Sequence, residues 1–394
     1  MRDTLSPTEF IKIALSTARH YGFDTIDHAK ATLSLDALVP RKAPLTKILV
    51  ADRKSDALGG MLTAGIAAFI DNNLHGSTRP ILFSTVETAS RTGELSIGLH
   101  IIGMEKSIAE ALLIHTARGL LTDCGYASHT VRINSLGDKE SVARYTRELT
   151  NFMKKRIEEL PPTAREIMKQ HSISALMHLI EKDHELSYRS PSPLEYLSDQ
   201  SRKHFRELVE YLDTSSALYE IDSRLLANHQ CYSDAVFSVE IKDELGVPSA
   251  TPPITIRGGR YDEFVKRLTK TNIPAVGAVI TFSEKKAPSR LPKIENDKKP
   301  GVFLVQLGFG PKMRSLLLLE ELRKANIKTH HVLSSDSLGD QLRLAEQLKS
   351  PYALILGQKE FVEKSIIVRN LSSRSQEYVQ LAALIPHLKR VTHA

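Results

Sequence analysis

The sequence predicts an α+β protein with two folded parts joined by a linker. Strand-prone runs such as Pro253-Ile254-Thr255-Ile256 and several helical patterns share residues 1–286. Residues 287–300 contain three prolines, three lysines and little apolar content, which is typical of an exposed linker. From residue 301 to residue 394, strand and helix patterns alternate. This alternation predicts a mostly parallel sheet covered by helices on both faces.

Four segments of the first part carry clear patterns. Ser6-Pro7-Thr8-Glu9 has the residue types of a helix start, with a capping serine, a proline at the first helical position and a glutamate at the third. A strand-like run at residues 48–50 precedes a small-residue apolar helix over about 58–69, and residues 107–121 form another amphipathic helix. The long polar helical stretch from residue 139 to about 182 is broken at Pro161-Pro162.

In the second part the expected order is strand 302–305, helix 313–322, strand 328–333, helix 338–348, strands 353–356 and 366–368, and a closing helix through Val379 and Leu388. Gly308-Phe309-Gly310 lacks the lysine spacing of a phosphate-binding loop, so it predicts a plain turn from strand to helix.

Composition limits the function classes. The 394 residues carry 53 Lys and Arg against 46 Asp and Glu, a net charge of +7 and a pI near 9.2, which suits a polyanionic partner. Two cysteines, Cys124 and Cys231, give no disulfide framework and fit a reducing compartment. No apolar targeting segment opens the chain, and no apolar run approaches the roughly 20 residues that span a bilayer. We therefore expect a cytoplasmic protein, without a metal site because the histidines are scattered.

The most informative motif is Arg257-Gly258-Gly259-Arg260-Tyr261-Asp262, which follows a strand-prone run. Paired glycines after a strand let another group approach the backbone closely. A β-bulge or tight turn without a ligand would use the same residues. The motif alone leaves both interpretations open.

The run from Arg132 to Thr281 resembles the core of the class II histidyl-tRNA synthetases in the order and spacing of its motifs. Arg132–Asp138 resembles the segment that leads into the family's helical insertion, and Gly258–Asp262 resembles its glycine-bearing strand. Residues 353–360 and 366–370 resemble the family's anticodon-binding domain. The resemblance implies an antiparallel core sheet flanked by helices, an insertion at about 139–190, a homodimer and tRNA as a partner.

The chain departs from the family where the chemistry occurs. In the family, an arginine-glycine-leucine-aspartate-tyrosine-tyrosine segment supplies a catalytic arginine and contacts to histidine; here Ala227 replaces the arginine, Gln230 replaces the aspartate and Tyr232 keeps the last tyrosine. Glu284 stands where the last motif normally places an arginine on the ATP phosphates. The second motif keeps one candidate arginine, Arg91.

These losses matter because activation brings a carboxylate against the α-phosphate of ATP, and fixed cations must offset the negative charge that develops. Losing one such donor costs roughly 3–4 kcal/mol of transition-state stabilisation. We therefore expect no catalytic residue at the degraded positions. We expect a vestigial ligand pocket formed by Arg91, Tyr232, Gly258, Gly259, Arg260, Tyr261 and Asp262.

Three functions remain open at this point. The first is a non-catalytic paralogue that binds tRNA, with Arg369, Arg374 and Arg390 as candidate contacts, or binds a protein partner. The second is a divergent histidine-tRNA ligase, which alone would require ATP and Mg²⁺. The third resembles the regulatory subunit of ATP phosphoribosyltransferase, although such subunits generally lack the anticodon-binding domain that this chain resembles.

Overall fold

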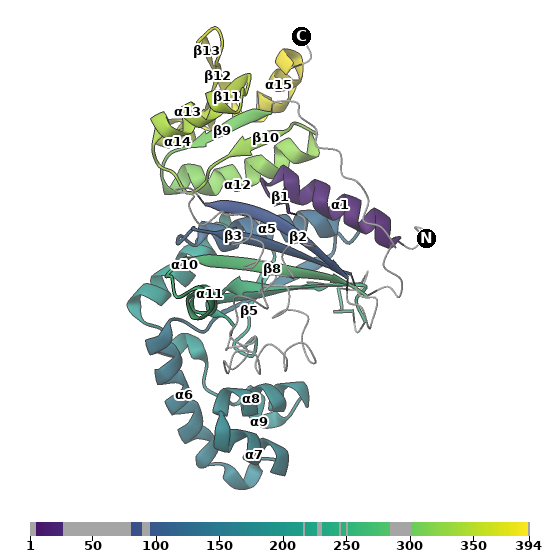
Figure 1. The fold of residues 1–394 in the computed structure, drawn as a ribbon, viewed down its shortest axis with the longest axis vertical. Coiled ribbons are helices and arrows are strands. Elements are labelled where there is room, and N and C mark those ends of the chain that lie inside the picture. Colours follow the sequence, from purple (N-terminus) through teal and green to yellow (C-terminus); the bar gives the residue numbers. More distant parts are fainter. Residues whose placement is uncertain are drawn as a thin grey trace.

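The computed structural model contains an eight-stranded sheet and a five-stranded sheet, with helices between them and a helical insertion at one end (Figure 1). The structure describes residues 5–26, 80–88, 95–215, 217–226, 231–243, 246–249, 251–283 and 301–392. The strand and helix expected over residues 48–69 and the linker expected at 287–300 lie outside the described residues. The domain boundaries at 286/287 and 300/301 therefore stay predictions.

The eight-stranded sheet has the antiparallel core that the family resemblance implied. Its strands are β1 (Asp24–Thr25), β2 (Ile81–Thr88), β3 (Leu95–Ile102), β4 (His129–Ser135), β5 (Tyr219–Ile221), β6 (Ser233–Ile241), β7 (Ile254–Arg260) and β8 (Ala275–Phe282). Their order is β1-β2-β3-β8-β7-β6-β4-β5. All inner neighbours pair antiparallel, while the edge strands β1 and β5 each pair in parallel.

Three helices pack on one face of this sheet, which we call the α5 face. They are α1 (Pro7–His20), α5 (Ile108–Asp123) and α10 (Asp199–Thr214). Helix α1 begins as predicted, because the side chain of Ser6 accepts from the amide of Glu9 and the Glu9 carboxylate accepts from the amide of Ser6. Helix α5 is buried on nearly all sides, which explains its almost continuous apolar sequence.

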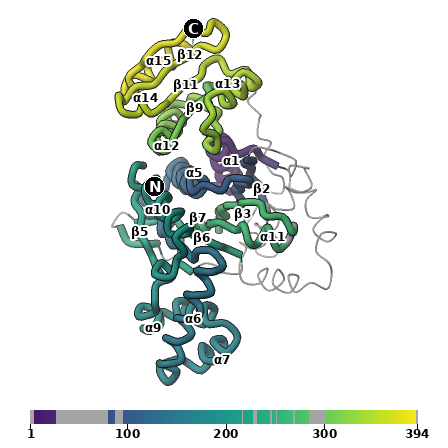
Figure 2. The backbone as a smooth tube through the Cα atoms, turned by 90° about the vertical axis from the view of Figure 1, so that its left-hand side faces the viewer, coloured from purple at the N-terminus to yellow at the C-terminus, as the bar shows by residue number. Residues whose placement is uncertain are grey.

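The helical insertion follows β4 and projects beyond the sheet (Figures 1 and 2). It contains α6 (Lys139–Lys154), η3 (Ile157–Glu159), α7 (Pro162–Gln170), α8 (Ser172–Glu181), α9 (Glu185–Tyr188) and η4 (Pro193–Tyr196). The predicted break is confirmed, since α7 starts at Pro162. The turn from β4 into α6 requires glycine, because Gly137 has φ +73° and a Cβ there would lie 2.4 Å from Cβ of Ser141. A short helix, α11 (Asp262–Thr269), connects β7 to β8.

The five-stranded sheet contains β9 (Val302–Gln306), β10 (Thr329–His331), β11 (Tyr352–Leu356), β12 (Ser365–Asn370) and β13 (Gln376–Gln380) in the order β10-β9-β11-β12-β13. Its helices are α12 (Phe309–Lys324), α13 (Leu338–Gln347), α14 (Gln358–Glu363), η5 (Leu381–Ala383) and α15 (Leu384–Thr392). The strand and helix order up to residue 356 agrees with the sequence prediction, whereas the short helix α14 between β11 and β12 was not predicted.

Two predictions for this sheet were wrong. Only β10, β9 and β11 are parallel; β12 and β13 form an antiparallel hairpin, so the sheet is mixed. Val379 lies in β13, and the closing helix begins at Leu384. In the stretch 376–380 only Val379 is buried, and such a single apolar residue on an edge strand carries too little periodicity to be distinguished from helix.

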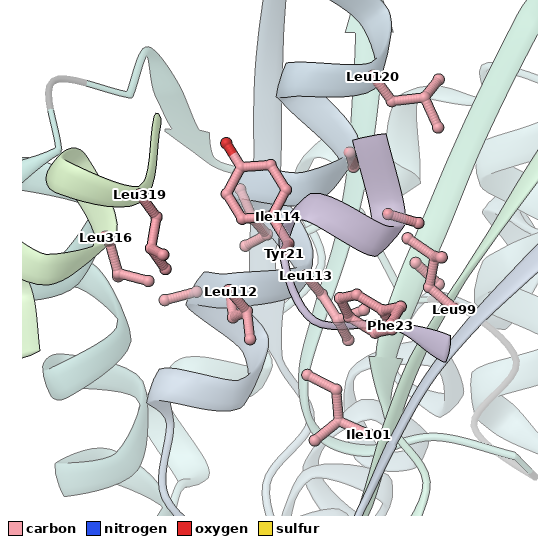
Figure 3. Packing of buried hydrophobic residues seen from close by; sticks show 14 of the residues in the cluster. Tyr21, Phe23, Leu99, Ile101, Leu112, Leu113, Ile114, Leu120, Leu316 and Leu319 are labelled. Carbon is pink, nitrogen blue, oxygen red and sulfur yellow. The ribbon is translucent and has the colours of Figure 1, made fainter. Parts of the chain in front are cut away.

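The two sheets share one hydrophobic core. Helix α12 packs against α5, and Figure 3 shows Leu316 and Leu319 of α12 near Leu112 of α5 and the ring of Tyr21. All four residues belong to one buried cluster that continues into both sheets. Because an apolar interface of this kind resists domain motion, the part beyond residue 301 is held against the first part.

Polar groups surround this seam between α1, α5, α12 and β10. Tyr21 donates its hydroxyl hydrogen to Glu320, and Arg323 pairs with Asp123 and, at 2.8 Å, with Glu320. His20 Nε2 lies 3.2 Å from the carbonyl oxygen of Leu319. Each contact joins the first part of the chain to the second, except the Arg323–Glu320 pair within α12.

Three histidines at the seam, His20, His115 and His331, have pKa values lowered to about 4, chiefly because burial disfavours the imidazolium. His331 Nε2 also lies 3.1 Å from the carbonyl oxygen of Tyr21, and the charge of Arg118 adds to the effect at His115. All three are therefore neutral at pH 7 and above.

We predict that acid destabilises the fold between pH 6.5 and pH 4. In that window the unfolded chain binds protons at these histidines and the folded chain does not, so stability is fully present above pH 6.5 and is lost as pH falls. The free energy of unfolding should change with pH by at most about 1.4 kcal/mol per pH unit for each histidine, and by less for the half-buried His20 and His331. Urea unfolding followed by circular dichroism at each pH measures it.

The double variant His115→Gln/His331→Gln should flatten this dependence. The matched control is His178→Gln in α8, at the opposite end of the molecule, which should leave the slope unchanged. Equal slopes for all three proteins would contradict the assignment.

Candidate functional site

A cavity of about 350 Å³ lies against β6 and β7, bounded by α8 of the insertion and by the loop after β5. Its charged and aromatic lining residues are Arg132, Glu181, Arg224, Tyr232, Phe237, Glu240 and Arg257. Its apolar lining includes Met177, Ile180, Leu225, Leu226, Pro248 and Pro252. A space of this size and mixed lining has the dimensions of a small-molecule site.

The strand register places two of the cavity's arginines on the same face of the sheet. Arg132 of β4 lies opposite Ser238 of β6, and Ser238 lies opposite Arg257 of β7. The two arginines are therefore separated by two strand spacings, roughly 10 Å. This face is opposite the α5 face, because Val131 and Ile133, which alternate with Arg132 on β4, belong to the buried cluster around α5.

Carboxylates of the chain neutralise Arg132. It forms ion pairs with Asp222 at the end of β5 and with Glu240 of β6. Its side chain is about a third exposed, so the pairs are partly screened but fix its direction. Arg132 consequently links its own strand β4 to β6 and to the end of β5.

The loop after β5 is fastened to both the sheet and the insertion. The side-chain amide of Asn134 donates to the carbonyl oxygens of Ser223 and Leu225 at 3.3 and 3.1 Å. Arg224 stacks on Tyr188 with its guanidinium carbon 3.8 Å from the ring centroid, and it pairs with Asp183 at 3.3 Å. Arg224 is therefore also engaged with groups of its own chain. Arg257 is an exposed residue that lines the cavity.

Of the predicted pocket residues, Tyr232 and Gly258 line this cavity. Arg260, Tyr261 and Asp262 do not appear in its lining. Arg91 and the degraded positions Ala227, Gln230 and Glu284 lie outside the described residues. The chemistry expected at these four positions therefore stays a prediction.

Arg260 is the centre of a buried ionic cluster on the α5 face. It is 2 % exposed and meets Glu110 of α5, which is fully buried, through two hydrogen bonds of 2.8 and 2.9 Å. His204 of α10 lies 2.7 Å from the same carboxylate, and Arg260 also donates to the carbonyl oxygen of Met104. The cluster fastens β7, α5 and α10 together, so the retained arginine has a structural contact.

Burial alone would raise the pKa of Glu110, but the charges of Arg260 and His204 outweigh it and lower the pKa to about 2. At Asp262 burial dominates and raises the pKa to about 6, although Arg260 and the amide of Ala275, which donates at 2.6 Å, oppose it. Glu110 is therefore the ionised partner of Arg260 over the whole neutral range.

Tyr261 fills space between strands. Its hydroxyl lies 3.0 Å from Nδ1 of His100, and the His100 ring stacks on Phe83 at 5.0 Å. A Cβ at Gly277 would lie 2.9 Å from the Tyr261 ring, so glycine is required there by the tyrosine. Burial raises the pKa of the Tyr261 hydroxyl far above its ordinary value, which keeps it neutral.

The paired glycines are explained by close packing within the sheet. A Cβ at Gly258 would lie 2.4 Å from the Phe237 ring, and one at Gly259 would lie 2.7 Å from the carbonyl oxygen of Ala235. The neighbouring strand β6 carries a bulge between Ser233 and Val236, opposite this segment. A β-bulge was one of the two interpretations of the paired glycines. It does occur, but in β6, the strand paired with them.

The three candidate tRNA contacts are not on one surface. Arg369 lies in β12 and Arg374 in the turn of the β12–β13 hairpin. Arg390 lies on α15, which packs on the other face of that sheet through Leu384 and Leu388. Arg369 and Arg374 therefore share one hairpin, and Arg390 lies on a different element.

The sequence reasoning missed Glu110, Arg132 and Arg224. Glu110 had a visible signal, since it is a lone acid inside the apolar run Ile108-Ala109-Glu110-Ala111-Leu112 and such an acid needs a buried partner. Arg132 and Arg224 had none, because their partners are distant in sequence. Within the described residues, no three His, Cys, Asp or Glu side chains are grouped to hold a metal ion.

We predict that Glu110→Gln lowers the free energy of unfolding by about 3–5 kcal/mol, because it leaves the buried, charged Arg260 with only the more distant carboxylate of Asp262, at 3.5 Å. The control Glu105→Gln, at an exposed site a few residues away, should change it by less than about 0.5 kcal/mol. Urea unfolding at pH 7 measures both.

The Glu110–Arg260 pair contributes stability that is present above pH 4.5 and is lost as pH falls toward 2, because the pKa of Glu110 is lower in the folded chain than in the unfolded chain. In that window Glu110→Gln should show a shallower decline than the wild type. An unchanged stability at pH 7 would show that the cluster carries little of the fold.

Comparison with known proteins finds relatives for the C-terminal part and for most of the chain. A family model described as an anticodon binding domain matches residues 312–390. The histidine–tRNA ligase of Geobacillus sp. (strain WCH70) is 26 % identical over 336 residues, which cover 82 % of this chain and 79 % of that protein. The histidine–tRNA ligase of Bacillus subtilis (strain 168) is 27 % identical over 294 residues, covering 74 % and 69 %. The apo histidyl-tRNA synthetase of S. aureus superposes with a TM-score of 0.45 at 18 % identity, covering 83 % and 82 %. Over most of its length the chain is therefore similar to class II histidyl-tRNA synthetases, and its C-terminal part matches an anticodon binding domain.

Proposed function

We propose that this chain is a non-catalytic member of the family that binds tRNA through its C-terminal domain. The observation that carries the proposal is the fate of the arginine that the chain retains from the family's glycine motif. Arg260 is buried in a two-bonded pair with Glu110, so it cannot reach across the sheet to replace a lost phosphate contact.

The other arginines near the cavity support the same conclusion. Arg132 is held by Asp222 and Glu240, and Arg224 is held by Asp183 and Tyr188. A triphosphate needs several fixed cations to offset its charge. The described cavity brings two glutamates, Glu181 and Glu240, into the same lining, which opposes polyanion binding.

The sequence adds two substitutions that also remove positive charge from the expected ATP site. Ala227 and Glu284 stand where the family places arginines, and the second of them reverses the charge. Losses of this kind compound even when they are not additive.

The alternative is a divergent histidine–tRNA ligase, which one observation favours. The cavity of about 350 Å³ is large enough for a small substrate, and the exposed guanidinium of Arg257 lies at it. One arginine does not replace several, so we place this function second.

The match to the anticodon binding domain over residues 312–390 supports tRNA as the partner, and the net charge of +7 agrees with a polyanion. It also disfavours a regulatory subunit of the kind that lacks this domain. A cytoplasmic homodimer and a protein partner remain part of the proposal through family resemblance. No helix in the described part of the chain has the length and apolarity to cross a membrane.

The test is histidine-dependent pyrophosphate exchange beside tRNA filter binding, with the B. subtilis histidine–tRNA ligase as positive control. We expect exchange to be lower than in the control by at least roughly a hundredfold, the cost of one lost oxyanion donor, while tRNA is retained on the filter. Exchange at the control's rate would establish the ligase instead.

A second variant checks the cause. If missing charge is what prevents activation, Ala227→Arg/Glu284→Arg should raise exchange above the wild-type level. Lack of tRNA binding by the wild type would overturn the proposed partner.

A further inference from the structure

Helix α12 is attached to the first part of the chain near both of its ends, and the two attachments differ in kind. Its end lies at the seam of buried leucines and hydrogen bonds between α1, α5, α12 and β10. At its start, the Phe309 ring packs against the Tyr211 ring of α10, with 5.0 Å between centroids. The hydroxyl of Thr214 in α10 also donates to the sulfur of Met313 at 3.3 Å. The start of α12 therefore rests on α10.

A single carboxylate, that of Asp336, connects this start to the core. Asp336 lies in the loop between β10 and α13. Its side chain accepts from Nζ of Lys312 at 2.6 Å and from Nζ of Lys106 at 2.9 Å. It also accepts from the amide of Gly308 at 3.2 Å. Lys312 and Gly308 belong to the start of α12, whereas Lys106 lies between β3 and α5, so the carboxylate joins both parts of the chain.

The segment that carries Lys106 is itself fixed to α10. The hydroxyl of Ser107, directly before α5, donates to the carboxylate of Glu207 in α10 at 3.1 Å. On the core side, the ionic contact of Lys106 and the aromatic contact of Tyr211 are therefore held in place relative to each other.

The turn Gly308-Phe309-Gly310, for which the sequence predicts only a passage from strand to helix, is part of this contact. Gly308 has φ +92°, and an added Cβ would meet nothing within 4 Å, so the backbone conformation and not crowding favours glycine there. The same residue supplies the amide that binds Asp336.

Two ammonium groups share this one carboxylate. Within the described parts of the chain, neither Lys106 nor Lys312 has a second carboxylate within ion-pair distance. Although burial opposes it, the hydrogen bonds from the two lysines lower the pKa of Asp336 to about 2. Asp336 is therefore ionised throughout the neutral range and attracts both lysines.

The two ion pairs differ in exposure. Lys312 is 3 % exposed, so its pair with Asp336 is largely shielded from the ions of the solvent. The side chains of Lys106 and Asp336 are 56 % and 46 % exposed. Exposed ion pairs are weak, and salt screens them over a Debye length of about 10 Å at 0.1 M and about 3 Å at 1 M. The pair that crosses between the two parts of the chain is thus the one that salt can weaken.

We propose an ionic latch at the start of α12, formed by Lys106, Lys312, Asp336 and Gly308. While Lys106 is bound to Asp336, the start of α12 is held on α10. When ions screen this pair, residues 309–313 and the loop 332–337 separate from the core, and the Lys312–Asp336 pair moves with them. The end of α12 stays packed at the buried seam, so the opening is local. This device goes beyond the proposed function and does not depend on it.

Hydrogen–deuterium exchange of the full-length chain, followed by mass spectrometry, tests the latch. In the wild type, the amides of residues 312–316 should exchange roughly 1.5- to 5-fold faster in about 1 M than in about 50 mM NaCl, the range expected for loss of one exposed ion pair. The amides of residues 319–324, at the buried end of the same helix, should keep their rate in both solutions. Lys106→Gln should give the faster rate already at low salt and remove the salt dependence, because it deletes only the pair that crosses to the core.

Two further variants separate the latch from a general effect of charge. Lys324→Gln removes the same charge near the end of α12, where Lys324 pairs with Glu320 of its own helix at 3.3 Å, and should leave the rate at residues 312–316 unchanged. Lys106→Arg keeps a cation and should return both the rate and its salt dependence toward the wild type. Circular dichroism confirms that each variant is folded.

The latch would be overturned by a wild type whose residues 312–316 exchange equally fast at both salt concentrations. A Lys106→Gln variant that exchanges like the wild type, or an equal acceleration by Lys324→Gln, would overturn it as well.

Discussion

The buried pair between Glu110 and Arg260 is the contact on which the rest of the core depends. Glu110 comes from the middle of α5 and Arg260 from the end of β7, and His204 brings α10 to the same carboxylate. An ion pair with 2 % and 0 % exposure is costly to desolvate and survives only with complete hydrogen bonding. Its geometry therefore fixes how the central helix lies across the sheet, and with it the strand whose glycines border the cavity.

Because of this ion pair, the residues that the chain retains from the glycine-bearing motif can be explained by packing, without any role in chemistry. Arg260 faces α5, Tyr261 packs over Gly277, and Gly258 makes room for Phe237. Each retained residue has a packing reason that holds whether or not a ligand binds. Retention of this motif is consequently weak support for activity.

Much of the fold could be predicted from local patterns. The capped start of α1, the break at Pro162 and the strand and helix order up to residue 356 all depend on neighbours in sequence. The β12–β13 hairpin was missed because Val379 is the only buried residue of its edge strand, so the alternation that marks a strand is nearly absent. The cavity was harder still to predict, since strand register brings Arg132 and Arg257 to it, and Arg224 lies in a loop that hydrogen bonds from Asn134 hold in place.

The shared hydrophobic core also fixes the orientation of the C-terminal domain relative to the first part of the chain. Leu316 and Leu319 of α12 lie in the same buried cluster as Leu112 of α5, two residues after Glu110. The anticodon-binding domain therefore rests on the helix that orders the cavity strand. A domain attached by a linker alone would reorient freely, whereas one that buries leucines in a common core keeps a single orientation.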